Sequence, residues 1–151
     1  MPNDSTHRII NYLLLSVFVV ANFYFNITSN FTDIAVFMVV YVIGTEFLNP
    51  DLDTNSGPAR RLGFLSYPIR ILSKHRGYGH SIFIGWALKV LYILVIITII
   101  ASVIDWLNLS SYIPQIKISN EVIYVSLFGL FLSNLVHIVA DRISTFWKLH
   151  T

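Results

Sequence analysis

The feature that most constrains this chain is a series of long apolar stretches separated by polar segments. Four stretches, none containing a proline, occupy about residues 9–25, 31–48, 82–104 and 122–140. Each is close to the ~17–25 residues that a helix needs to cross ~30 Å of hydrocarbon. A strand in lipid would leave backbone polar groups without partners, whereas a helix pairs them internally. We therefore predict an all-α protein with four transmembrane helices.

Composition favours a membrane protein over a soluble one. Of 151 residues, 55% are hydrophobic and 12% are charged, and the mean hydropathy is +0.67. A soluble domain of this size cannot bury so much apolar side chain, so lipid must cover the remainder. The net charge of +2 is too small to indicate a nucleic-acid partner. The absence of cysteine leaves nitrogen and oxygen ligands for any metal ion.

The distribution of lysine and arginine predicts the orientation. The first and third connections contain one such residue, Lys117, whereas eight lie in the N-terminal segment, the second connection and the C-terminal segment. Cytoplasmic segments carry the excess of positive charge. We therefore expect both termini and the long loop 50–81 to lie in the cytoplasm. The whole chain, residues 1–151, is expected to form one domain, a four-helix bundle in the plasma membrane. No small-x-small cleavage site follows the first stretch, so we expect it to be retained.

Part of the long loop has the composition of a segment that contacts membrane lipids. Residues 59–74 mix apolar side chains with four cations. This mixture suits a segment in the headgroup region whose apolar side chains dip into the bilayer. Pro68 argues against one uninterrupted helix there.

Histidines and aspartates gather at the predicted cytoplasmic ends of the four helices. The predicted outer face has no histidine. The candidate metal ligands on the cytoplasmic side are His7, Asp51, Asp53, His75, His80, His137 and Asp141. Imidazole and carboxylate groups suit zinc, with manganese and iron as alternatives. Seven candidates exceed the shell of one zinc ion, so we expect one or two divalent ions.

The local spacing of these residues suits metal binding. His137 and Asp141 are four residues apart on a predicted helix, so both side chains lie on one face. Asp51 and Asp53 are two apart in an extended loop and point the same way. Glycines at 77 and 79 give the backbone the freedom to bring His75 and His80 together. Ser81 is a natural N-cap for the third helix.

Structural roles are the alternative for several of these residues. The two loop aspartates could be solvated or capping groups. Glu46 and Lys89, the charges inside spans, could neutralise each other across the second and third helices. Arg60 and Arg61 could anchor the chain to lipid headgroups.

Several motifs, in this order, resemble those of a family of small predicted metal-binding membrane proteins. They are Met1-Pro2 with Thr6-His7, Asn49-Pro50-Asp51-Leu52-Asp53, Arg61-Leu62-Gly63, Tyr67-Pro68, His75-Arg76-Gly77, Gly79-His80-Ser81 and His137-x3-Asp141-x3-Thr145. That family is similar to LexA-regulated inner-membrane proteins described as metal-dependent hydrolases. The Thr-His and His-x3-Asp motifs are more distantly similar to those of zinc-dependent phospholipase C. The resemblance implies the same seven metal ligands, while Leu62 and Lys89 stand where the family pattern has tryptophan and arginine.

These observations predict a metal-dependent hydrolase whose site lies at the cytoplasmic face. The substrate we expect is a phosphoester, including lipid phosphoesters, with Arg61 and Arg76 holding phosphate oxygens. Asp53 or Glu46 would serve as general base. The alternative is a metal-binding membrane scaffold or subunit in which ions tie helix ends together. An ion or proton carrier ranks last, because the middle of each apolar stretch has few polar residues.

Overall fold

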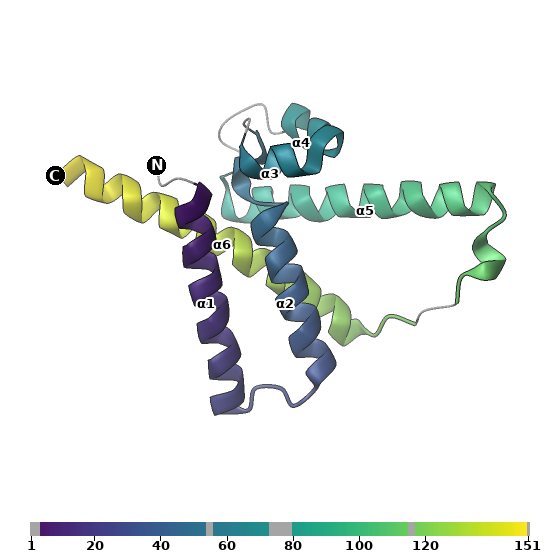
Figure 1. Cartoon of the computed structure of the whole chain (residues 1–151), viewed down its shortest axis with the longest axis horizontal. Helices are drawn as coiled ribbons and strands as arrows, with labels where there is room; N and C mark the ends of the chain where they lie inside the picture. Colours follow the sequence, from purple (N-terminus) through teal and green to yellow (C-terminus); the bar gives the residue numbers. More distant parts are fainter. Residues whose placement is uncertain (1–3, 54–55, 73–79, 115–116, 151) are drawn as a thin grey trace.

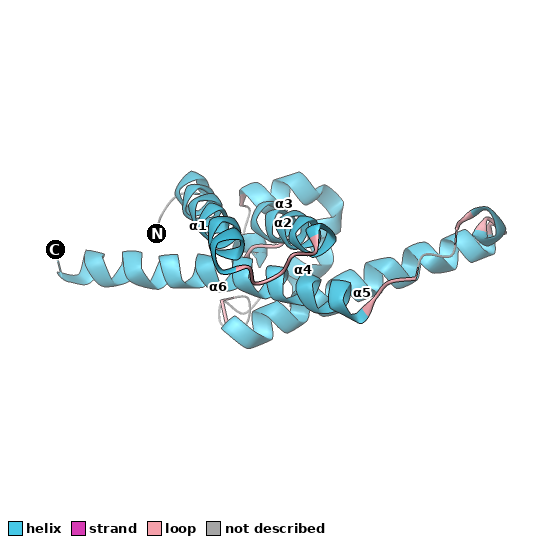
Figure 2. Ribbon diagram, turned by 90° about the horizontal axis from the view of Figure 1, so that it is seen from below, coloured by secondary structure: helices cyan, strands magenta, loops and turns pink. Residues whose placement is uncertain are grey.

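The computed structural model describes residues 4–53, 56–72, 80–114 and 117–150, without the side chains of residues 4, 53, 72 and 147–150. Every regular element in these ranges is helical, and no strand occurs in them (Figure 2). The prediction of an all-α protein is therefore confirmed for the described chain. The elements are α1 Asp4–Phe25, α2 Phe31–Glu46, η1 Pro50–Asp53, α3 Gly57–Leu62, η2 Gly63–Leu65, α4 Ser66–Leu72, α5 Ile82–Trp106, η3 Ser110–Tyr112 and α6 Asn120–His150.

Three of the described helices are long and apolar enough to cross a membrane. They cover Ser5–Phe25, Ile82–Trp106 and Asn120–Phe146. The remaining apolar stretch forms α2, which has 16 residues and ends at Glu46, two residues earlier than predicted. It is thus slightly shorter than the ~17–25 residues of a typical span.

The closest helix packing is between α2 and α6, which cross in the centre of the molecule (Figure 1). A Cβ atom at Gly44 of α2 would collide with Ser133 Oγ of α6. One at Gly129 of α6 would lie 3.2 Å from the Phe37 carbonyl oxygen of α2. Small residues therefore let the two backbones approach. Helix α1 lies beside α2 and packs on α6 through a core of Leu15, Tyr41 and Leu132.

Among the described residues, helix α5 packs against the rest of the chain mainly through residues 82–96. Its buried residues are Gly85, Lys89 and Tyr92, and the apolar side chains that follow are largely exposed. In both overall views the helix extends away from α1, α2 and α6 (Figures 1 and 2). The described chain is therefore not a regular bundle of four helices side by side. Because apolar side chains cover most of the surface of α5 beyond Tyr92, periodicity does not single out one face for packing.

The described parts of the connection between α2 and α5, residues 47–53 and 56–72, fold as a compact cap on the ends of these helices. Its core consists of Leu48, Leu52, Ala59 and Ile69, which pack with Tyr92 of α5 and Leu130 of α6, and Val40 of α2 lies against this cluster. Gly63 separates α3 from the following turn and has a positive φ of 57°, which favours glycine. Pro68, which we expected to interrupt a helix, lies in the first turn of α4, where a missing N–H is tolerated. The interruption is at Gly63 instead.

Candidate metal centre

Four of the predicted ligands meet where the cap joins the helices. Asp51 comes from η1, His80 precedes α5, and His137 and Asp141 lie one turn apart on α6. Their ligand atoms all lie within 4.8 Å of one another. Residues more than 80 positions apart in the sequence are thus brought to one point.

Local hydrogen bonds place these side chains. The Asp51 amide donates to Asn49 Oδ1 at 3.1 Å, which fixes the start of η1. Ser81 accepts from the Ile84 amide and caps α5, as the sequence predicted, so it sets the position of His80 at the helix entrance. The spacing of four residues puts His137 and Asp141 on one face of α6.

Histidine nitrogens and carboxylate oxygens alternate around the centre of the cluster. His80 Nε2 lies 3.4 Å from Asp51 Oδ1 and 3.6 Å from Asp141 Oδ2. His137 Nε2 lies 3.3 Å from Asp51 Oδ2 and 3.5 Å from Asp141 Oδ2. These separations exceed the ~2.7–2.9 Å of a charge-assisted hydrogen bond. Ligand atoms ~2.0–2.1 Å from a tetrahedral zinc ion would be about 3.3–3.4 Å apart.

Burial provides a second test of whether this group fits a metal ion. His137 is 2% exposed, and neither its Nε2 nor Asp141 Oδ2 has a hydrogen-bond partner among the described residues. Buried polar atoms without partners are costly, and a cation between them would satisfy both. The side chains of Asp51 and His80 are 26% and 24% exposed. The cluster is therefore closed on the α6 side and open on the side of η1 and α5.

The electrostatics of Asp51 favour the form that binds metals. Burial alone would raise the pKa of this carboxyl group, but the close approach and charge of His137 and His80 hold the pKa well below its usual range. The carboxylate is therefore ionised near neutral pH, as a metal ligand must be.

His7 lies beside the cluster, in contact with two of its members. Its Nε2 is 3.1 Å from Asp141 Oδ1, the oxygen that does not face the other histidines. Its ring stacks on that of His137, with centroids 4.0 Å apart and planes 18° apart. His7 is 2% exposed. These contacts suit a residue that orients Asp141 and His137, a role that histidine and carboxylate partners commonly have around metal sites. The predicted role of His7 as a metal ligand stays a prediction.

Two asparagines that we did not single out from the sequence support the site. Asn11 donates to the His7 carbonyl oxygen at 3.0 Å, and its Oδ1 accepts from Tyr41 at 3.1 Å. Asn134 donates to the Ile82 carbonyl oxygen at 3.3 Å and accepts a hydrogen bond from Lys89. Both asparagines could have been found in the sequence as polar residues within an apolar stretch. Asn11 also lies four residues after His7, one helical turn further on.

Glu46 and Arg61, predicted as catalytic groups, belong to a separate ion-pair cluster. Glu46 Oε1 lies 2.7 Å from Arg8 Nε and accepts from Tyr12, and Oε2 lies 3.0 Å from Arg61 Nη1. Arg61 Nη1 also donates to the Glu46 carbonyl oxygen at 2.9 Å. Both carboxylate oxygens are thus engaged, which argues against Glu46 as a general base. Glu46 therefore pairs with Arg8, Tyr12 and Arg61 in place of the suggested pairing with Lys89. These contacts join α1, α2 and α3.

Three predicted site residues cannot be placed in the same way. His75 and Arg76 lie outside the described residues, and so does the side chain of Asp53. Their predicted roles as ligand, phosphate contact and general base stay predictions.

Comparison with known sequences agrees with the geometry. Residues 2–151 match the model of a family described as "Uncharacterized metal-binding protein (DUF2227)". The chain is also 33% identical to a protein of Aquifex aeolicus (strain VF5) described as uncharacterized, over 74% of this chain and 92% of that protein. No solved structure matches the chain significantly.

Proposed function

This chain belongs to that family of metal-binding proteins, and on this premise we propose that it is an integral membrane hydrolase with a divalent-metal centre. The observation that carries the proposal is the group formed by Asp51, His80, His137 and Asp141, whose ligand atoms converge within 4.8 Å. The substrate that we propose is a phosphoester, including those of lipids.

The ligand set narrows the choice of metal. Two imidazoles and two carboxylates suit zinc, and also manganese and iron, whereas calcium and magnesium prefer oxygen ligands alone. The four described side chains form one compact group, which supports a single ion. A second ion would need ligands from Asp53 or His75.

The open side of the cluster supports catalysis. A bound divalent ion would supply Lewis-acid stabilisation and an activated water molecule. His137 and Asp141 hold the buried side, while the partial exposure of Asp51 and His80 leaves room for substrate on the other. The N-terminus of α5, next to His80, favours an anionic group such as phosphate. Arg76 and Asp53 are proposed as the phosphate contact and the general base.

The proposed membrane embedding is supported by the exposed apolar side chains. Along the three long helices, exposed residues include Val20, Phe23, Leu94, Ile97 and Ile123. Such extensive apolar exposure is typical of surfaces that lipid covers. Positive charge at the N-terminal end of α1 and in α3 and α4 supports a cytoplasmic position for the metal centre.

A structural role for the ion is the second candidate. The four ligands come from η1, the start of α5 and α6, so one ion would join three segments. Four protein ligands would also complete a tetrahedral zinc shell, which is typical of structural sites. The two roles differ in whether a coordination position remains open to water.

The test measures metal content and hydrolysis in the same preparation. We expect the purified protein to hydrolyse at least one of a panel of phosphomonoesters, phosphodiesters and phospholipids. A chelator should abolish this activity, and zinc or manganese should restore it. Arg76→Ala should preserve metal content and folding but lower kcat/KM about tenfold to hundredfold, because hydrogen bonds to charged groups contribute ~1.5–3 kcal/mol.

Arg70→Ala is the matched control, because Arg70 is an exposed arginine of α4. It should leave both metal content and hydrolysis unchanged. A folded, metal-loaded protein without chelator-sensitive hydrolysis on any of these substrates would favour the scaffold. Unfolding on chelation would support the same conclusion.

A further inference from the structure

Helix α4 of the cap has one buried face and one exposed apolar face. Ile69 is buried in the core of the cap, and Ser66 is buried on the same side. Tyr67 and Ile71 are four residues apart, so they share the other face, where they are 65% and 54% exposed. Phe64, three residues before Tyr67, is 85% exposed. An exposed row of large apolar side chains is typical of a surface that contacts a partner or a membrane.

The charge that accompanies this row is positive. Between Asp53 and Asp105 the chain contains no aspartate or glutamate, whereas α3 and α4 contain three arginines. Arg61 pairs with Glu46, as described above. Arg60 and Arg70 are both exposed, and Arg70 follows Tyr67 by three residues, on the same side of α4. Apolar side chains and cations without acids complement an anionic lipid surface.

The cap also lies beside the apolar surface of α5. The Tyr92 hydroxyl of α5 donates to the Leu65 carbonyl oxygen at 2.5 Å, and Tyr92 packs with Ile69 in the core of the cap. Helix α4 therefore lies alongside the N-terminal part of α5 and not beyond its end (Figure 1). On either side of Tyr92, Leu91 and Leu94 are each 54% exposed. Lipid that covers these leucines would also reach the exposed face of α4.

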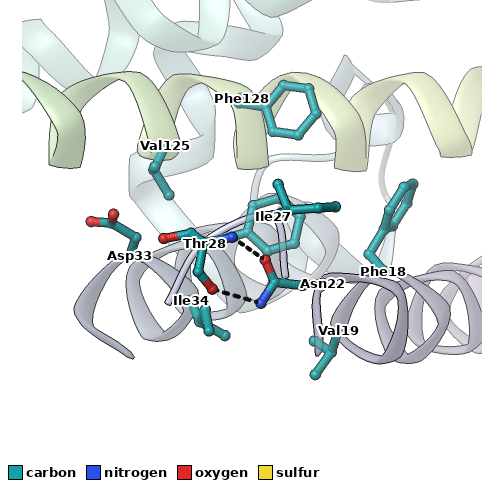
Figure 3. A pocket seen from close by; sticks show the side chains of 10 residues that line it. Phe18, Val19, Asn22, Ile27, Thr28, Asp33, Ile34, Val125 and Phe128 are labelled. Carbon is teal, nitrogen blue, oxygen red and sulfur yellow. Dashed lines mark hydrogen bonds between the residues drawn. The ribbon is translucent and has the colours of Figure 1, made fainter. Parts of the chain in front are cut away.

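The apolar groove at the other end of α1, α2 and α6 provides a contrast. Phe18, Phe37 and Phe128 contribute to its wall, and neither lysine nor arginine is among the described residues that line it (Figure 3). Its one charged lining residue is Asp33. Such a groove offers nothing to an anionic headgroup, so the combination of apolar row and cations distinguishes the cap.

On the premise of the membrane embedding proposed above, we propose that α3, η2 and α4 form an interfacial segment that binds anionic lipid headgroups. Phe64, Tyr67 and Ile71 enter the interface, and Arg60 and Arg70 bind headgroup phosphates. A phosphatidylcholine headgroup has no net charge, so the arginines favour an anionic lipid over it. A second copy of this chain is a poorer occupant, because a symmetric contact would bring the same cations together.

The test follows lipid contact at Tyr67 in the full-length protein. The chain has no cysteine, so Tyr67→Cys provides one site for the fluorophore NBD. Nanodiscs contain equal amounts of phosphatidylcholine and phosphatidylglycerol, and one of the two lipids carries bromine, which quenches the fluorophore on contact. Both brominated lipids should quench the label, and brominated phosphatidylglycerol should quench it more. We expect the anionic lipid to be enriched about fivefold for each arginine near the surface.

Charge substitutions test the source of this preference. Arg60→Gln combined with Arg70→Gln should make quenching by the two brominated lipids equal. Arg142→Gln, at an exposed arginine of α6, is the matched control and should keep the preference. Neither Arg60 nor Arg70 belongs to the metal centre, so the double variant should retain the metal content of the parent protein.

Three results would overturn the proposal. The Tyr67→Cys label could be quenched by aqueous iodide and not by brominated lipid, or be shielded from both, which would indicate a protein contact. Equal quenching by the two lipids without any charge substitution would refute the preference for anionic lipid. A label at Leu94→Cys of α5 separates these failures from failure of the proposed membrane embedding, because brominated lipid should quench it whenever α5 is embedded.

Discussion

Replacing His7 with phenylalanine tests whether His7 supports metal binding through Asp141 and His137. The His7 ring stacks on His137 at 4.0 Å and its Nε2 lies 3.1 Å from Asp141 Oδ1. Phenylalanine keeps a ring of similar size but removes the polar contact with Asp141. The hydrogen bond from Asn11 reaches the backbone carbonyl of residue 7, so it does not depend on this side chain.

The expected magnitude follows from the position of Asp141. Loss of a partner that orients a metal ligand typically lowers metal affinity 10- to 100-fold, which is about 1.4–2.8 kcal/mol. His137→Ala removes one of the four converging ligand atoms, so its effect should be at least as large. The apo form of His7→Phe should also lose about 1–3 kcal/mol of stability, because Asp141 Oδ1 is left buried without its partner.

Competition with a chromophoric chelator measures these affinities, and thermal unfolding in detergent measures stability. Asp105→Asn, at an exposed position near the far end of α5, is the control and should match the parent protein. Wild-type affinity in His7→Phe would refute the orienting role of His7. Full metal occupancy in His137→Ala would refute the ligand pair on α6.

Three further predictions concern topology, packing and pH. Single cysteines introduced at Asn55 and Asn108 should react with a membrane-impermeant thiol reagent from opposite sides of the membrane, and labelling from one side would refute the proposed crossing pattern. Gly44→Val should destabilise the fold by about 1–3 kcal/mol in thermal unfolding, because a side chain there meets Ser133, whereas Ala101→Val on the exposed part of α5 should not. Burial alone would raise the pKa of Asp51, but His137 and His80 lower this pKa in the folded protein. The ionised carboxylate therefore stabilises the fold fully above about pH 4, the pKa of the unfolded chain. This stabilisation is lost as the pH falls below about 4 towards the lowered pKa of the folded state. Asp51→Asn should therefore flatten the acid branch of the stability profile, and an unchanged branch would contradict this assignment.

Local sequence patterns predicted what local geometry determines. The Ser81 cap and the shared face of His137 and Asp141 follow from hydrogen bonding and helical periodicity within a few residues. The same reasoning located the apolar helices, although it ended α2 two residues late and began α1 five residues late. Charged and polar residues at the N-terminal end of α1 extend this helix beyond the part that hydropathy alone can detect.

Contacts between distant segments were not predictable in this way. The crossing of α2 over α6 depends on Gly44 meeting Ser133, and a glycine in an apolar stretch does not identify its neighbour. The divergence of α5 has a similar origin, since a helix that is apolar over most of its surface has no strongly preferred packing face. Without these crossings, the sequence could group seven candidate ligands by membrane side but could not distinguish ligands from supporting residues.

The ionisable residues within and near the helices divide by how their polar atoms are satisfied. Glu46 has donors for both carboxylate oxygens, from Arg8, Tyr12 and Arg61, so this cluster is complete without a ligand and acts as a structural link. His137 and Asp141 instead leave Nε2 and Oδ2 buried and without hydrogen-bond partners among the described residues. A protein would gain stability by replacing such a pair with apolar side chains, unless a cation satisfies it. The contrast between a complete ion-pair cluster and an incomplete one therefore points to the second as the place where function resides.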